Sequence, residues 1–96
     1  MTTITKQQLQ AVVDRINRET NSPMTPYVRI DGKLIAQIGN YHLESAYSGF
    51  QLVRMCNESG GISNVLHSGF NTKRETYDLI HAFLRGLEAS KQLATA

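Results

Sequence analysis

The same helix-start signature occurs twice in this chain, once towards each end. Thr5 is followed three residues later by Gln8, and Thr72 is followed three residues later by Glu75. In such a capping box the threonine hydroxyl accepts a hydrogen bond from the backbone of the third helical residue, whose side chain accepts one from the threonine backbone. The two signatures therefore predict a helix that begins after Thr5 and a second helix that begins after Thr72.

Apolar residues after each signature recur at helical spacing. In the first segment, Leu9, Val12, Val13 and Ile16 follow the i, i+3, i+4, i+7 pattern of one buried stripe. The turn-forming residues and two prolines of 20–26 end this helix. The second segment has a wider apolar face, made of Thr76, Ile80, Phe83, Leu84 and Leu87. Each helix therefore needs an apolar surface to cover.

The first part of the central region reads as a hairpin. Asp31-Gly32 separates two β-rich runs, and this dipeptide suits a type I′ turn, which needs positive φ at both central positions. We therefore expect strands near 27–30 and 33–38. The segment 39–49 has two interpretations: it continues the second strand through a bulge at Gly39, or it forms a loop that contains Tyr41 and Tyr47.

A second hairpin is expected in the remainder of the central region. Residues 50–57 have strand character, 58–61 contain the Gly-Gly turn, and 62–68 form the return strand. An antiparallel sheet with one apolar face gives both helices a surface to cover. The sequence thus predicts a two-layer α+β fold of order α-β-β-β-β-α, in which one sheet of about four strands packs against the N- and C-terminal helices.

The bulk properties fit one domain over residues 1–96, with fraying expected at 1–4 and 90–96. A charged fraction of 19% and a hydrophobic fraction of 41% are ordinary for a globular protein. The single cysteine, Cys56, excludes an internal disulfide and favours a reducing compartment. No apolar run is long enough for a membrane span, and the opening "MTTITKQQ" does not resemble a secretory signal. We therefore expect a cytoplasmic protein of a bacterial host, with no membrane partner.

The residue types that perform catalysis or bind metals are scattered. His42, His67, His81 and Cys56 show none of the paired spacings of metal sites. The acidic residues form no pattern that suits general acid–base catalysis. A Cys56 nucleophile with a histidine base is the weaker alternative, because a cysteine in a strand is more commonly a small buried side chain. The sequence therefore predicts no catalytic residue, metal site or cofactor, and a protein that is not an enzyme.

Five residues are candidates for contact with a partner. Lys73 and Arg74 occupy the first helical turn after Thr72, where cations oppose the helix dipole. They either hold a phosphate or carboxylate group or extend into water. Tyr41 and Tyr47 are in or beside loops, where tyrosine is a common interface anchor, although core packing is an equal alternative. Arg54 is a further cation that a nucleic-acid surface would use.

The segment 41–89 resembles small accessory proteins encoded in the early regions of lambda-like phages and prophages. The resemblance is found in "AYSGFQLVRMCNESGG" and in "TKRETYDLIHAFLRGL", and the opening "MTTITKQQL" is frequent in such proteins. No general activity is assigned to this family. The resemblance implies a protein that is made in an infected bacterial cell and acts on host machinery.

Two function hypotheses follow from these observations. The first is a non-catalytic binding protein that engages and modulates a host protein, in a host take-over or anti-defence role. The second is a nucleic-acid-binding module, which the net charge of +2 permits without favouring it. The predicted topology is similar to the double-stranded RNA-binding domain, in which cations at the start of the second helix contact phosphates. The chain departs from that domain by a fourth strand and by a shorter basic cluster. A homodimer through the wide apolar face of the second helix is compatible with either function.

Overall fold

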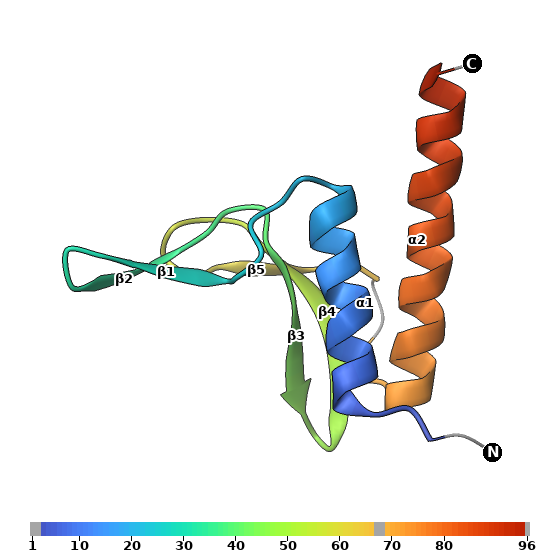
Figure 1. Ribbon diagram of the computed structural model, residues 1–96. Coiled ribbons are helices and arrows are strands. Elements are labelled where there is room, and N and C mark those ends of the chain that lie inside the picture. The colour runs from blue at the N-terminus through green and yellow to red at the C-terminus, as the bar shows by residue number, and fades with distance from the viewer. Residues whose placement is uncertain (1–2, 67–68, 96) are drawn as a thin grey trace.

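The computed structural model describes residues 3–66 and 69–95, and within them the chain forms two helices and five strands. The order along the chain is α-β-β-β-β-β-α (Figure 1). The helices are α1 (Lys6–Glu19) and α2 (Lys73–Thr95). The strands are β1 (Tyr27–Ile30), β2 (Lys33–Ala36), β3 (Tyr41–Ala46), β4 (Gly49–Met55) and β5 (Ile62–Asn64). The predicted α+β class, with a helix towards each end and antiparallel strands between, is confirmed.

The strands form two separate sheets, which differs from the expected single sheet of about four strands. β1 pairs with β2, and β3, β4 and β5 form a three-stranded antiparallel sheet in that order. The first hairpin has its expected turn, since Asp31 and Gly32 both have positive φ. The segment 39–49 is neither a loop nor an extension of β2. Gly39 turns the chain at φ 93°, and a new strand, β3, begins at Tyr41.

Both predicted capping boxes are present and set the helix starts. The backbone N–H of Gln8 donates to the Thr5 hydroxyl at 3.1 Å, and the Thr5 N–H donates to the Gln8 side chain at 2.8 Å. The same reciprocal pair joins Thr72 and Glu75, at 3.1 Å in each direction. These bonds satisfy backbone donors that the first turn of a helix otherwise leaves free.

The main core lies between the two helices and the three-stranded sheet. α1 and α2 run side by side in the same direction in front of this sheet (Figure 1). The buried members of the core cluster are Ile4, Leu9, Val12, Val13, Ile16, Tyr41, Leu52, Ile80 and Leu84. Ile4 is therefore packed, although fraying was expected for 1–4. At the other end α2 remains helical to Thr95, through most of the segment 90–96 where fraying was also expected.

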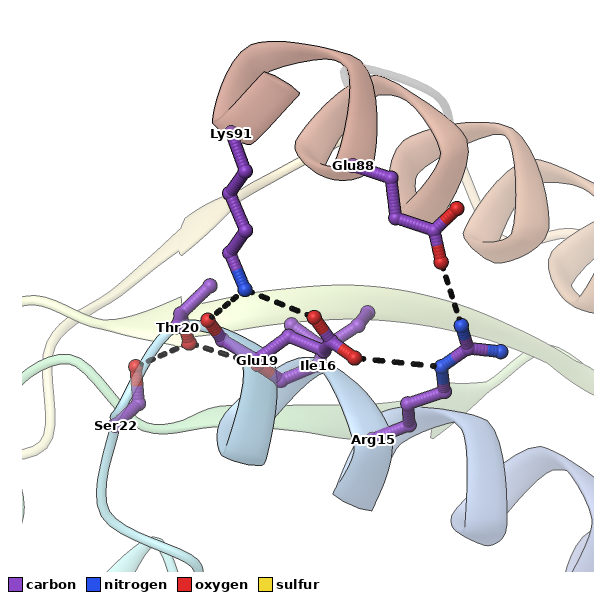
Figure 2. A network of polar contacts seen from close by, with 7 residues as sticks. All are labelled: Arg15, Ile16, Glu19, Thr20, Ser22, Glu88 and Lys91. Atoms are coloured by element: carbon purple, nitrogen blue, oxygen red, sulfur yellow. Dashed lines mark hydrogen bonds and ion pairs between the residues drawn. The ribbon is translucent and has the colours of Figure 1, made fainter. Parts of the chain in front are cut away.

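Polar contacts join the two helices along their exposed side. Arg15 Nη2 lies 2.7 Å from Glu88 Oε1, and Lys91 Nζ lies 2.8 Å from Glu19 Oε2 (Figure 2). Lys91 also donates to the backbone oxygen of Glu19 at 2.8 Å. Hydrogen bonding and charge attraction from Lys91 hold the pKa of Glu19 below its ordinary value.

A buried asparagine attaches α1 to the sheet. The Asn17 side-chain N–H donates to the Tyr41 carbonyl at 3.0 Å, and its side-chain oxygen accepts from the Tyr41 N–H at 2.9 Å. Asn17 therefore pairs with the start of β3 as a neighbouring strand would. Within the described ranges 3–66 and 69–95, neither helix has the length and apolar character needed to cross a membrane.

Candidate functional site

Three chain segments meet at one end of the molecule. They are the start of α1, the start of α2 and the tight turn between β3 and β4 (Figure 1). Both helix starts are local consequences of the capping boxes. Their meeting is a tertiary consequence of packing the two helices in parallel against the same sheet.

The start of α2 is fixed to the beginning of β4. Phe50 and Asn71 exchange two backbone hydrogen bonds of 2.8 Å each, which places the approach to α2 beside β4. Gly49 allows a close approach at this contact, because a Cβ there would lie 3.0 Å from the Phe70 Cβ and 3.1 Å from the Asn71 oxygen, which is tighter than most such contacts. As a result, Lys73, the first residue of α2, lies close to the β3–β4 turn.

The β3–β4 turn contains no glycine at its two central positions. Tyr47 and Ser48 have φ values of 52° and 59°, in the left-handed region. A residue other than glycine in this backbone conformation costs about 1–2 kcal/mol relative to the right-handed conformation. The surrounding ladder, which pairs Ala46 with Gly49, holds the turn in this form.

A hollow of about 390 Å³ opens to solvent at the meeting of the three segments. Its lining contains two cations from distant parts of the sequence, together with hydroxyl groups and one aromatic side chain. The lining residues are Lys6, Ser45, Ala46, Ser48, Gly49, Phe50 and Lys73. As far as the structure describes the chain, neither lysine has an ion pair within 4.0 Å, and neither serine side chain makes a hydrogen bond.

The carboxylate nearest in sequence to Lys73 is already in use. Glu75 accepts from the backbone N–H of Thr72, and this hydrogen bond lowers the pKa of Glu75. Glu75 is therefore ionised at neutral pH, and its charge serves the helix start.

The predicted pair of cations is separated by the structure. Lys73 lines the hollow, whereas Arg74 extends along α2, where its Nη1 lies 4.0 Å from Asp78 Oδ1. An exposed pair at this distance contributes little to stability. The two neighbouring residues therefore differ in surroundings, although both were predicted to have the same role.

The two candidate tyrosines also differ from each other. Tyr47 is 92% exposed at the tip of the turn, with its ring 5.7 Å from that of Phe70. Tyr41 is buried, and its ring lies 5.9 Å from Phe83. Of the two alternatives given for Tyr41, the structure has core packing and not an exposed binding surface, because the side chain lies in the core beneath the helices.

Arg54 is exposed but lies away from the hollow. Its guanidinium stacks 5.3 Å from the centre of the Tyr41 ring, and Arg54 pairs in register with Tyr41 at the opposite end of the β3–β4 ladder from Ala46 and Gly49. Five residue steps along a strand correspond to about 17 Å. Arg54 therefore does not form one site with Lys73.

Lys6 is the residue that the sequence interpretation missed. It occupies the first position of α1, as Lys73 occupies the first position of α2. The repeated order of capping threonine followed by lysine was visible in the sequence. The sequence does not reveal that the two helices pack in parallel, and this packing places both lysines at the same hollow.

The β1–β2 hairpin is a second surface with unusual exposure. It projects away from the helices as an arm (Figure 1), and among the described strands β1 and β2 pair only with each other. Leu34 is 60% exposed and Ile30 is 49% exposed. The other large apolar side chains exposed on the arm and its base are Met24, Tyr27, Val28 and Ile38. An isolated two-stranded hairpin is marginally stable in water.

His42 and Cys56 have different surroundings. His42 lies between Asn40 and Glu44 on β3, at 3.1 Å and 3.3 Å, and His67 lies outside the described residues. Cys56 is an exposed free thiol, which corrects its expected burial. Across 3–66 and 69–95, no group of three His, Cys, Asp or Glu side chains is placed to hold a metal ion.

Comparison with protein-family models, with curated proteins and with solved structures found no match to this chain.

Proposed function

We propose that this chain is a non-catalytic binding protein that engages and modulates a host protein in the cytoplasm of an infected bacterium. The exposed apolar arm formed by β1 and β2 supports this function most directly. The resemblance of 41–89 to small accessory proteins of lambda-like phages supports the cellular setting.

The arm suits contact with protein for two reasons. First, burying an exposed leucine or isoleucine side chain stabilises a complex by about 1.5–3 kcal/mol, and the arm offers Ile30 and Leu34 near its tip. Second, no described strand lies beside the outer edges of β1 and β2, although the last residue of β2, Ala36, donates its N–H to the Glu58 carbonyl, so a partner strand can extend the sheet along the rest of the arm. The partner gains main-chain hydrogen bonds from the edge and apolar contacts from the side chains.

Affinity capture from bacterial lysate tests this function. We expect the full chain to retain a host protein in stoichiometric amount, and the double variant Ile30→Ser, Leu34→Ser to retain at least tenfold less. The matched control is Leu79→Ser, Leu93→Ser, which removes two exposed leucines from α2 and leaves the arm intact. If no stoichiometric partner is retained, or if the arm variant retains as much as the control, the arm is not the contact surface.

A nucleic-acid-binding module is the second candidate, and the cationic end of the molecule favours it. Lys6 and Lys73 lie beside the β3–β4 turn, so all three elements can face one ligand. The main sheet has three strands with both helices packed on it, and the additional strands form the separate arm. This arrangement is more similar to the double-stranded RNA-binding domain than the four-stranded sheet expected from the sequence, although the basic cluster remains short.

Salt-dependent binding to duplex RNA of about 16 base pairs tests this second function, because this length matches the footprint of double-stranded RNA-binding domains. Affinity should fall steeply with salt, and Lys6→Glu with Lys73→Glu should abolish binding. The control Lys33→Glu with Arg85→Glu makes the same charge change away from the hollow. An equal loss of RNA affinity in both double variants would indicate a general charge effect and contradict a binding site at the hollow.

A further inference from the structure

We propose that the hollow between the two helix starts binds a phosphomonoester, that is, a phosphate group attached through one oxygen to a small organic molecule. This inference concerns a different surface from the apolar arm and does not depend on the host-protein function. It rests on the cavity and on the side chains that line it.

The charge of the lining matches a doubly charged anion. Lys6 and Lys73 both line the hollow, and neither has a carboxylate within 4.0 Å among the residues described. Like charges around a shared cavity disfavour each other. A phosphomonoester carries about −1.5 to −2 charges at pH 7, which neutralises the pair. An internal phosphodiester of a nucleic acid has a single negative charge, so two successive phosphates would be needed to neutralise the pair.

The remaining lining groups suit the rest of such a ligand. The hydroxyls of Ser45 and Ser48 have donors available, since neither is engaged within the described part of the chain. Phe50 offers an aromatic surface on which an apolar or ring-shaped organic group can lie. The helix starts are already capped by Thr5 and Thr72, so the recognition comes from the side chains.

The size of the hollow indicates more than a bare phosphate ion. Its volume of about 390 Å³ is within the range of roughly 300–1,000 Å³ that is usual for small-molecule pockets. A phosphate at the lysines would leave space towards Phe50 for its organic group. A nucleoside monophosphate has this combination of a dianionic end and a flat ring.

Titration calorimetry of the full chain tests the site with adenosine 5′-monophosphate, inorganic phosphate and adenosine as probes. We expect the monophosphate to bind more tightly than inorganic phosphate, and adenosine to show no measurable binding. Lys6→Gln and Lys73→Gln should each weaken monophosphate binding at least tenfold. Arg74→Gln is the matched control, because it removes a neighbouring cation outside the lining and should change the affinity less than twofold.

In this titration, three results would overturn the proposal: no binding of adenosine monophosphate at millimolar concentration, equal binding of adenosine, or equal weakening by Arg74→Gln and Lys73→Gln. Circular dichroism of each variant shows that the fold is retained. Each variant replaces one exposed or half-exposed residue at the start of a helix, so it leaves the core unchanged.

The source of the phosphomonoester is resolved by a second titration. Short single-stranded oligonucleotides are compared with and without a 5′-terminal phosphate. Tighter binding of the phosphorylated strand than of adenosine monophosphate supports the end of a nucleic acid as the source, whereas tighter binding of the monophosphate supports a free metabolite. Equal binding of both oligonucleotides would show recognition of internal phosphates and would overturn the phosphomonoester proposal.

Discussion

Gly32 and Gly86 both have open space where a side chain would be, yet their backbones differ. A Cβ at either position would meet nothing within 4 Å. Gly32 has a φ of 79° in the β1–β2 turn, whereas Gly86 lies within α2. The effect of adding a methyl group is therefore decided by conformation at both residues and not by packing.

Alanine at these two positions should change stability in opposite directions. Gly32→Ala should lower the free energy of unfolding by about 1–2 kcal/mol, because the left-handed backbone is unfavourable for alanine. Gly86→Ala should raise it by about 1 kcal/mol through helix propensity. Urea unfolding measures both values, and amide exchange of the arm reports whether the Gly32 change is local. A change of the same sign in both variants would contradict this account.

Asn17 should be among the most sensitive polar residues of the chain. It is buried, and its amide makes two hydrogen bonds with the backbone of Tyr41. Asn17→Ala leaves a buried N–H and a buried carbonyl unpaired, at a cost of about 1–3 kcal/mol for each group. Gln10→Ala is the control, since within the described chain the Gln10 side chain makes one hydrogen bond, an exposed one to Asp14. Denaturant unfolding should show a loss several times larger for Asn17→Ala, and equal losses would contradict the role of Asn17.

At the scale of the elements, local chemistry was readable from the sequence and long-range pairing was not. The capping threonines, the apolar stripe of α1 and the Asp31-Gly32 turn each act over a few residues, so their patterns predict their structures. β3 was ambiguous because its start depends on the positive φ of Gly39 and on pairing with β4. The contacts of Arg15 and Lys91 with α2 and α1 depend on how the helices pack, which no local pattern specifies.

The contact between Lys91 and Glu19 makes part of the helix–helix stability dependent on pH. The folded-state pKa of Glu19 is lowered, mainly by the hydrogen bond from Lys91. The stabilisation is therefore present above the ordinary carboxyl pKa of 4.5 and is lost as pH falls through the lowered folded-state value. Lys91→Gln should reduce stability more at pH 7 than at pH 3.

Thermal unfolding at the two pH values measures this difference. Arg85→Gln is the control, because Arg85 has no ion pair within 4.0 Å among the residues that the structure describes. The loss of thermal stability caused by Arg85→Gln should differ less between the two pH values than the loss caused by Lys91→Gln. A Lys91→Gln effect that is independent of pH would show that the bond to the Glu19 backbone, and not the carboxylate, is the important contact.

At the scale of the whole molecule, the separation into a helix-covered sheet and a free arm could not be read from the sequence. Both hairpins have similar β character, so their patterns did not reveal which one the helices cover. The candidate site was predicted in part. Lys73 was identified from its unfavourable position in the helix dipole, whereas Lys6 joins it only through the parallel helix arrangement.

The exposed side of α2 should support self-association. α2 continues beyond the end of α1 (Figure 1), and its Leu93 is 78% exposed while Leu79 is also exposed. We expect sedimentation equilibrium to show a concentration-dependent dimer, and Leu79→Ser with Leu93→Ser to weaken it at least tenfold. The arm variant Ile30→Ser with Leu34→Ser is the control. A wild-type chain that remains monomeric at high concentration would contradict this prediction.

The pairing of the first helix with the last has a consequence for synthesis. Arg15 and Glu88 are separated by 73 residues, and Lys91 and Glu19 by 72. The apolar stripe of α1 therefore leaves the ribosome long before α2 exists to cover it. Translation proceeds at about 5–20 residues per second, so the exposed stripe persists for several seconds in every new chain. Each new chain therefore presents an apolar surface until the residues of α2 have been made.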